Sequence, residues 1–219
     1  MFSASAQFYD LIYSTFKDYV AEAEQITSLL RRLNPQCHTV LDVGCGTGEH
    51  ARLLAAQGFV VDGLDLDPTF VRIAAYKHPA GQFVAADMSD FHLSRRYDAV
   101  LCLFSSIGYL KTLDRVVRAS KCFRDHLAPG GVIVIEPWFA PGTLDPGGVF
   151  RHAGEGNGVR VSRVSRTEID ARLSRLYFEY EVTDETGTRR ASEVHELGLF
   201  TSTELLQTFQ EVGLQVDYD

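Results

Sequence analysis

The sequence has few cysteines, and they lack the spacings on which cysteine sites depend. The four, Cys37, Cys45, Cys102 and Cys122, are scattered along 219 residues and form no CxxC pair. Zinc sites and small disulfide frameworks use more closely spaced cysteines, and the HxH or HExxH spacings of metal sites are also missing. We therefore expect no metal and no disulfide. Free thiols at these positions suit a reducing cytoplasm.

Long apolar runs are missing as well. No uncharged stretch comes near the roughly 20 residues of a membrane-spanning helix. The opening segment, residues 1–7, has neither the basic start nor the apolar run of a secretory signal. We therefore expect a soluble protein that is not exported and that has no membrane partner.

Positive charge is not in excess, because 29 acidic residues outnumber 21 Lys and Arg and give a formal charge of -8 at pH 7. Contacts to a phosphate backbone are made largely by clustered Lys and Arg. The sequence therefore argues against nucleic acid as the main partner and favours a small molecule.

Short apolar strands alternate with helices through the first 137 residues. A helix with an apolar face is predicted from Tyr19 to Leu33, before Asn34-Pro35. Further helices are predicted at 50–57, 68–77 and 113–127, and strands at 39–43, 59–64, 82–86, 99–104 and 132–135. Apolar strands between helices are typical of a parallel sheet buried on both faces. We therefore predict an α/β fold with a Rossmann-like, doubly wound, mostly parallel sheet.

The pattern changes beyond Pro137, where prolines and glycines interrupt regular structure until about Val159. Three runs with a two-residue period then predict an inserted three-stranded antiparallel sheet. A last helix should begin at the capping box of Thr201 and Glu204 and end at Gly213, before a final short strand. We expect 1–137 and 200–219 to form the core with an N-terminal helical lid, and 138–199 to form a loop and an antiparallel insertion over the active site.

A glycine-rich loop follows the first predicted strand and runs from Asp42 to Gly48. Glycines at 44, 46 and 48 allow a ligand to approach the backbone, and the helix that starts next attracts anions. Dinucleotide enzymes show GxGxxG, whereas the third glycine comes one residue early here. The loop indicates a nucleotide-like ligand, and a Rossmann-like binder of another kind remains an alternative.

Carboxylates stand at the ends of the next two predicted strands. Asp65 comes 21 residues after Gly44, where a carboxylate accepts both ribose hydroxyls in the dinucleotide fold. Asp87 ends the third strand, where it would accept from an adenine amino group while Met88 packs against the ring. Three consecutive strand ends therefore favour one adenosine-containing ligand.

These motifs, together with Leu127 to Gly131, resemble class I S-adenosylmethionine-dependent methyltransferases over nearly the whole chain. The resemblance implies S-adenosylmethionine as the cofactor, its methionine part against the glycines, its ribose on Asp65 and its reactive sulfonium near Leu103 and Phe104. It places the cofactor site at Asp42, Gly44, Gly46, Asp65, Leu66, Asp87, Met88 and Leu103.

A narrower resemblance is carried by Phe104 to Leu110, Lys17-Asp18-Tyr19, Met88 to Phe91 and Glu136-Pro137-Trp138. These segments are similar to the N,N-dimethyltransferases that act on TDP-linked 3-amino-3,6-dideoxy sugars in macrolide pathways. The resemblance implies an amino-sugar acceptor and a homodimer. The sequence departs from that group in having Gly44 in place of alanine, Asp65 in place of glutamate and a different loop after Trp138.

The N-terminal lid should carry Tyr9, Tyr13, Lys17 and Tyr19. The resemblance suggests Tyr13, Lys17 and Tyr19 for the methionine carboxylate or the substrate, and we assign Tyr9 to the substrate side. Tyr19 also lies on the apolar stripe of its helix, so packing is an alternative role for it.

The acceptor side is expected at the end of the fourth strand and on the insertion. Tyr109 would orient an amine or take its proton, and its ordinary pKa near 10 favours orientation. Phe104 and Trp138 would contact the substrate, and Arg163 would bind a diphosphate. The alternatives are a packed aromatic for Tyr109, an exposed loop anchor for Trp138 and a solvated strand face for Arg163.

Other functions remain open from the sequence. The signature of enzymes that methylate nucleic-acid bases is replaced after the fourth strand by Phe104-Ser105-Ser106-Ile107. Methylation of another small amine, hydroxyl or carboxylate, and a non-catalytic cofactor-binding module, are the alternatives to an amino-sugar methyltransferase.

Overall fold

A five-stranded parallel sheet forms the centre of the computed structural model, which describes residues 5–217. The strand order is β3-β2-β1-β4-β5 and all four pairings are parallel. The strands are β1 (Thr39–Val43), β2 (Val60–Asp65), β3 (Phe83–Ala85), β4 (Tyr97–Cys102) and β5 (Leu127–Ile135). The predicted α/β fold with a mostly parallel sheet is confirmed.

Four of the helices in residues 5–217 begin where a side chain caps their free N–H groups. Asp18, Asp67 and Thr112 accept from the first turns of their helices, and Thr201 and Glu204 form the predicted capping box. Among residues 5–217, no helix is both long and apolar enough to cross a membrane. The helices are α1 (Tyr9–Tyr13), α2 (Tyr19–Leu33), α3 (Glu49–Ala56), α4 (Pro68–Lys77), the 3-10 helix η1 (Ser106–Leu110), α5 (Leu113–Asp125) and α6 (Ser202–Glu211).

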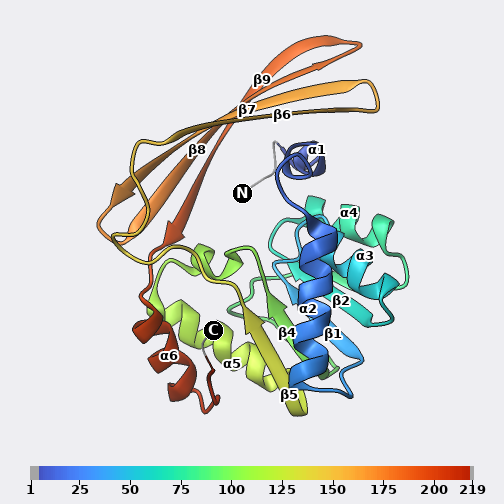
Figure 1. The fold of residues 1–219 in the computed structure, drawn as a ribbon, viewed down its shortest axis with the longest axis vertical. Coiled ribbons are helices and arrows are strands. Elements are labelled where there is room, and N and C mark those ends of the chain that lie inside the picture. The colour runs from blue at the N-terminus through green and yellow to red at the C-terminus, as the bar shows by residue number, and fades with distance from the viewer. Residues whose placement is uncertain (1–4, 218–219) are drawn as a thin grey trace.

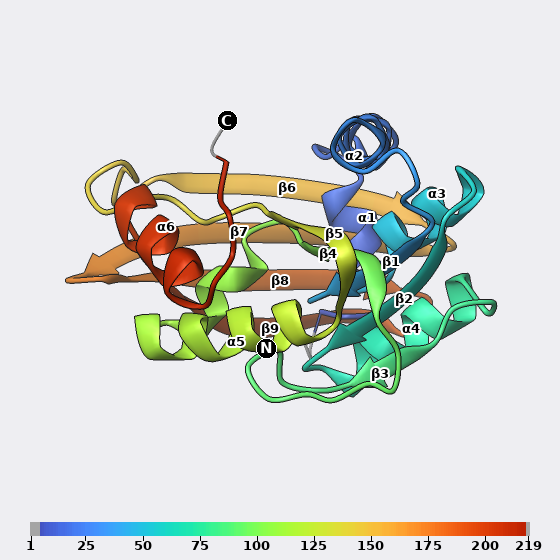
Figure 2. The ribbon, with the colours of Figure 1, turned by 90° about the horizontal axis from the view of Figure 1, so that it is seen from below.

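Two apolar clusters hold the helices on opposite faces of the sheet. On one face, Val116 and Phe123 of α5 and Leu205 of α6 pack against β1, β2 and β4. On the other face, Leu30 of α2 and Leu54 of α3 pack on the alternate residues of the same strands. Figure 2 shows α2 and α5 on the two sides of the sheet. These helices cover the two faces of the sheet and not the edge at which its strands end.

A second sheet of four antiparallel strands covers that edge. Its order is β6-β7-β8-β9, it lies across the top of the core in Figure 1, and α1 lies beneath it. The strands are β6 (Val149–Gly156), β7 (Val159–Asp170), β8 (Leu173–Asp184) and β9 (Gly187–Gly198). Three strands are predicted from the sequence, so the prediction misses β6.

Close approach of the lid explains why β6 contains glycines. A Cβ atom at Gly154 would lie 2.0 Å from the backbone oxygen of Leu11 in α1, and one at Gly156 would lie 2.8 Å from the Leu11 side chain. Glycine in a strand marks such an approach as well as a break. The glycines predicted to interrupt regular structure let α1 rest directly on the sheet.

The final short strand predicted after Gly213 is not formed in residues 214–217. The N–H of Leu214 donates instead to the carbonyl oxygen of Phe209 at 3.1 Å, which closes the end of α6. Gly213 has a φ of 82°, as expected of a glycine that ends a helix. The chain therefore turns back onto the helix rather than leaving it as a strand.

The contact at Gly154 predicts a specific loss of stability. Gly154→Ala should lower the free energy of unfolding by about 1 to 3 kcal/mol, as overpacking does, because the new methyl group meets the backbone of Leu11. The control is Ala153→Val on the exposed face of the same strand, expected to change it by less than about 0.5 kcal/mol. Urea unfolding measures the free energy of unfolding of both variants. A Gly154→Ala protein as stable as the Ala153→Val protein would contradict the contact.

Candidate active site

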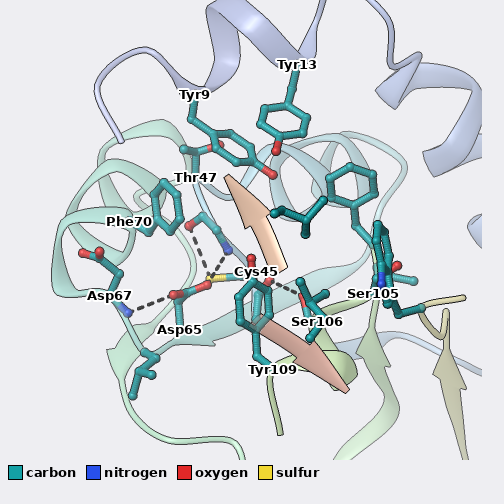
Figure 3. Close-up of a pocket in the computed structure, with 18 of the residues that line it drawn as sticks. Tyr9, Tyr13, Cys45, Thr47, Asp65, Asp67, Phe70, Ser105, Ser106 and Tyr109 are labelled. Carbon is teal, nitrogen blue, oxygen red and sulfur yellow. Dashed lines mark hydrogen bonds between the residues drawn. The ribbon is translucent and has the colours of Figure 1, made fainter. Parts of the chain in front are cut away.

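A cavity of about 440 Å³ lies between the carboxyl ends of the parallel strands and the inner face of the antiparallel sheet. Open α/β sheets bind ligands at this edge, where the strand order reverses, and here the reversal lies between β1 and β4. Figure 3 shows Tyr9 and Tyr13 reaching in from α1 and Asp65 and Tyr109 from the core. Residues far apart in the sequence therefore line one space.

The glycine loop brings its backbone to the floor of the cavity. Gly44 has a φ of 75°, and a Cβ atom there would lie 2.8 Å from Ser106 Oγ of η1. A Cβ atom at Gly48 would lie 2.7 Å from the Cβ of Ala74. The third glycine therefore serves close packing of α3 against α4, which explains its position immediately before Glu49. Gly46 faces open space, where a ligand can approach its backbone.

Asp65 is held at the end of β2 by the loop itself. The N–H of Gly46 donates to its Oδ2 and the N–H of Asp67 to its Oδ1, each at 2.9 Å. Burial raises the pKa of Asp65, and these hydrogen bonds oppose that rise. Leu66, the next residue, is 55% exposed at the rim of the same cavity.

Asp87 stands at the end of β3 with two partners that fix its orientation. Ser89 donates to Oδ1 through its N–H and its hydroxyl, each at 2.8 Å, and Arg115 of α5 donates to Oδ2 at 2.6 Å. Burial raises the pKa of Asp87, but these hydrogen bonds outweigh it and hold the pKa below its usual value. No motif in the sequence pointed to Arg115, which comes 28 residues later in the chain.

Asp42 is the most deeply buried carboxylate that lines the cavity. It is 2% exposed, and its Oδ2 has no hydrogen-bond partner within the described part of the chain. Burial raises its pKa, His50 opposes the rise and the nearby Asp65 adds to it, so that the pKa lies at about 6. An uncompensated carboxylate of this kind suits a cationic ligand.

The lid covers the cavity with aromatic rings and is tied to the core by one carboxylate. Tyr9 and Tyr13 stack with centroids 4.0 Å apart, and Tyr13 meets the ring of Phe104 edge-on at 5.5 Å. Asp10 accepts from the hydroxyl of Thr47 at 2.6 Å and pairs with Lys77 at 2.6 Å. These contacts join α1 to the glycine loop and to α4.

Lys17 and Tyr19 follow the lid, and only Tyr19 lines the cavity. The ammonium group of Lys17 pairs with Glu22 at 2.5 Å and lies 4.0 Å from the centre of the Phe104 ring. Glu22 also contacts His50 Nε2 at 2.8 Å. Lys17 therefore supports the wall behind Phe104, one layer away from the cavity.

Phe104 and Ser105 turn the chain sharply after β4. Their φ angles are 48° and 64°, in the left-handed region that non-glycine residues rarely adopt. Glu136 holds this turn, because its carboxylate accepts from the N–H of Phe104 at 2.7 Å and its backbone oxygen accepts from the N–H of Ser105 at 3.1 Å. Strained backbone held in this way is often found at functional sites.

Tyr109 and Arg163 face the cavity from the core and from β7 respectively. Burial raises the pKa of Tyr109 well above 10, so its hydroxyl stays protonated at neutral pH. Arg163 is 5% exposed, its guanidinium lies 4.9 Å from the ring centre of Tyr13, and its Nε and Nη1 have no partner in residues 5–217. Trp138 also lines the cavity, and its indole N–H donates to Ser174 of β8 at 2.8 Å.

Nearly every residue expected at the site from the sequence therefore lines this cavity, and Lys17 is the exception. Three residues that hold the site together, Asp10, Arg115 and His195, are not among those expected from the sequence. His195 of β9 lies 3.0 Å from the hydroxyl of Tyr109. The lining includes Tyr9, Tyr13, Tyr19, Asp42, Gly44, Gly46, Asp65, Leu66, Asp87, Met88, Leu103, Phe104, Tyr109, Trp138 and Arg163.

Comparison with known proteins identifies the family of the chain. A family model described as a methyltransferase domain matches residues 40–131. The dTDP-3-amino-3,4,6-trideoxy-alpha-D-glucopyranose N,N-dimethyltransferase of Streptomyces venezuelae is 38% identical over 97% of this chain and 91% of its own length. The dTDP-4-amino-2,3,4,6-tetradeoxy-D-glucose N,N-dimethyltransferase of Saccharopolyspora spinosa is 35% identical over 97% of this chain and 86% of its own.

The fold agrees with that of a solved structure. The crystal structure of Streptomyces venezuelae DesVI superposes with a TM-score of 0.91 at 38% identity, covering 97% of this chain and 91% of that one. Both resemblances drawn from the motifs are thereby confirmed. The chain belongs to the S-adenosylmethionine-dependent methyltransferases, in the group that contains these amino-sugar N,N-dimethyltransferases.

Proposed function

We propose that the protein transfers methyl groups from S-adenosylmethionine to the amine of a nucleotide-linked amino sugar. The near full-length similarity to two enzymes named for that reaction carries the proposal. One of them is named for a 3-amino sugar and the other for a 4-amino sugar, so the similarity favours the substrate class and leaves the position of the amine open.

The residues present fit the cofactor. The unpartnered carboxylate oxygen of Asp42 suits the ammonium group of the methionine part, and the open backbone at Gly46 leaves room beside it. Asp65 would accept the two ribose hydroxyls, and Asp87, already oriented by Arg115, would accept from the adenine amino group with Leu66 and Met88 beside the ring. When bound, S-adenosylmethionine supplies a methyl group on a cationic sulfonium.

The aromatic lid would keep water away from the reacting atoms. Tyr9, Tyr13 and Phe104 surround the cavity above the glycine loop, and their electron-rich faces suit a sulfonium cation. Tyr19 and Leu103 complete that wall. Methyl transfer is an in-line displacement, so holding donor and acceptor aligned is the main task of the protein.

The acceptor amine would lie against Tyr109. It must be neutral to attack, and the ammonium product then releases one proton to solvent. The raised pKa of the Tyr109 hydroxyl favours a role in orienting the amine rather than in removing its proton. Arg163 would bind the diphosphate and Trp138 would contact the substrate, and both side chains line the cavity. We also expect a homodimer and a cytoplasmic location.

The ribose assignment predicts the effect of one substitution. Asp65→Ala should weaken S-adenosylhomocysteine binding by about 2 to 3 kcal/mol, or about 30- to 150-fold in Kd, because hydrogen bonds to a carboxylate are lost. Isothermal titration calorimetry measures this, with Asp90→Ala, an exposed carboxylate outside the cavity, as the control. Equal affinities of the two variants would show that Asp65 does not hold the ribose.

The buried carboxylate of Asp42 predicts a pH dependence of stability. Because its folded pKa, about 6, exceeds the ordinary value near 4, the folded state binds more protons between those pH values, and stability falls as pH rises through that window. Asp42→Asn removes this cost and should raise the free energy of unfolding of the ligand-free protein at pH 7.5 by about 2 kcal/mol.

Asp98→Asn is the control, and it should change the free energy of unfolding in the opposite direction. Burial raises the pKa of Asp98, but hydrogen bonds from Thr39 and His38 outweigh it and lower the pKa, so this variant should be less stable at pH 7.5. Urea unfolding at pH 4, 6 and 7.5 compares the two variants. A ligand-free Asp42→Asn protein no more stable than the wild type at pH 7.5 would contradict the account of Asp42.

Turnover with a panel of acceptors tests the function itself. We expect N-methylation of a dTDP-3-amino or dTDP-4-amino deoxy sugar, measured by mass spectrometry, and no comparable methylation of small alcohols, carboxylates or simple amines. Arg163→Gln should raise the KM of the sugar nucleotide about 10-fold or more and leave S-adenosylmethionine affinity unchanged. Arg166→Gln, on the exposed face of the same strand, should behave as the wild type. Turnover only of acceptors without a nucleotide sugar would overturn the proposal.

A further inference from the structure

A chain of three polar side chains leads from the cavity into the antiparallel sheet. The hydroxyl of Tyr109 lies 3.0 Å from Nδ1 of His195, and Nε2 of His195 lies 3.4 Å from Oε2 of Glu193. His195 is 1% exposed and Glu193 8% exposed, both on β9. Tyr109 comes from η1 of the core, so the contact joins the two sheets at the reacting end of the cavity.

The proton on His195 can be placed from its surroundings. Burial lowers the pKa of His195, and Arg163 of β7 lowers it further, although the contact with Glu193 opposes this. The ring is therefore neutral at pH 7 and carries one N–H. Tyr13 of α1 and Tyr180 of β8 are further titratable groups near this place, and burial raises the pKa of both.

Glu193 acts as an acceptor, which decides which nitrogen holds the proton. Ser5 donates to its two oxygens through its N–H at 3.0 Å and its hydroxyl at 2.9 Å, and the hydroxyl of Tyr180 donates at 3.3 Å. A carboxylate that receives these donors accepts from Nε2–H of His195 as well. The lone pair of Nδ1 then faces Tyr109 and accepts its O–H.

We propose that His195 and Glu193 are positioning residues that fix the hydroxyl of Tyr109 as a hydrogen-bond acceptor for the substrate amine. With its proton committed to His195, the phenolic oxygen presents lone pairs to the cavity and accepts an N–H of the amine. The lone pair of the amine is then free to face the methyl group. The inference rests on the proposed function, because it assumes an amine acceptor.

The opposite orientation would hinder the reaction. If Nδ1 of His195 carried the proton, it would donate to the oxygen of Tyr109, and the Tyr109 O–H would turn toward the cavity. That O–H would donate to the lone pair of the amine, which is the pair that must attack. Fixing one tautomer of a histidine through a buried carboxylate is an established device in catalytic triads.

Two substitutions of His195 separate this role from simple packing. In His195→Asn the amide oxygen takes the place of Nδ1 and still accepts from Tyr109. In His195→Gln the amide reaches the place of Nε2 and keeps the contact with Glu193 but loses Tyr109. We expect His195→Asn to keep kcat within about 3-fold of the wild type and His195→Gln to lose about 10- to 100-fold, with S-adenosylmethionine Kd unchanged in both.

A double-mutant cycle shows whether His195 acts through Tyr109. Tyr109→Phe should lower kcat as much as His195→Gln does, and the double variant should be no slower than Tyr109→Phe alone. Thermal unfolding of every variant controls for loss of fold. Equal kcat values for His195→Asn and His195→Gln, or additive losses in the double variant, would overturn the inference.

The tautomer can be measured without turnover, which separates this inference from the proposed function. ¹⁵N NMR of the imidazole ring, assigned by comparison with His195→Asn, should show a proton on Nε2 and a hydrogen-bonded, unprotonated Nδ1 at pH 7. A proton on Nδ1 contradicts the inference whatever the substrate is. Failure to methylate any amino sugar, with the expected tautomer present, contradicts the proposed function instead.

Discussion

The common direction of the parallel strands is the constraint on which the site depends. Because all five strands end at one edge, the carboxylates at the ends of β1, β2 and β3 face one space, and the glycine loop lets a ligand approach them. Burying these charges is costly, as the raised pKa values of Asp42 and Asp65 indicate. A cationic, adenosine-containing ligand offsets this cost, which favours S-adenosylmethionine over a neutral or anionic molecule.

The antiparallel sheet supplies what the parallel sheet lacks, a cover over that edge. Ile12 and Tyr13 of the lid helix, and Phe8 immediately before it, pack on Phe178 and Val182 of the sheet, so lid and sheet form one layer. Polar contacts then join this layer to the core, through Asp10 to the glycine loop, Trp138 to β8 and Tyr109 to β9. The cover therefore shapes the acceptor end of the cavity, while the core shapes the cofactor end.

The sequence was sufficient for features that depend on local pattern. The parallel strands, the glycine loop and the acidic residues Asp65 and Asp87 follow from periodicity and from strand ends, and the group of methyltransferases follows from motifs. Contacts between distant segments could not be read in this way. His195 contacts Tyr109 although 86 residues separate them in the chain. The sequence does not predict β6, because its glycines are typical of a break in regular structure and only the fold shows Leu11 packed against them.

A crystal structure with S-adenosylhomocysteine and a dTDP-amino sugar tests the central claim most directly. The account predicts the ribose on Asp65, the sulfur atom beneath Tyr9 and Tyr13, and the amine nitrogen within hydrogen-bond distance of the Tyr109 hydroxyl, in line with the sulfur. An amine bound away from Tyr109, or a cofactor bound outside the cavity between the two sheets, would contradict it.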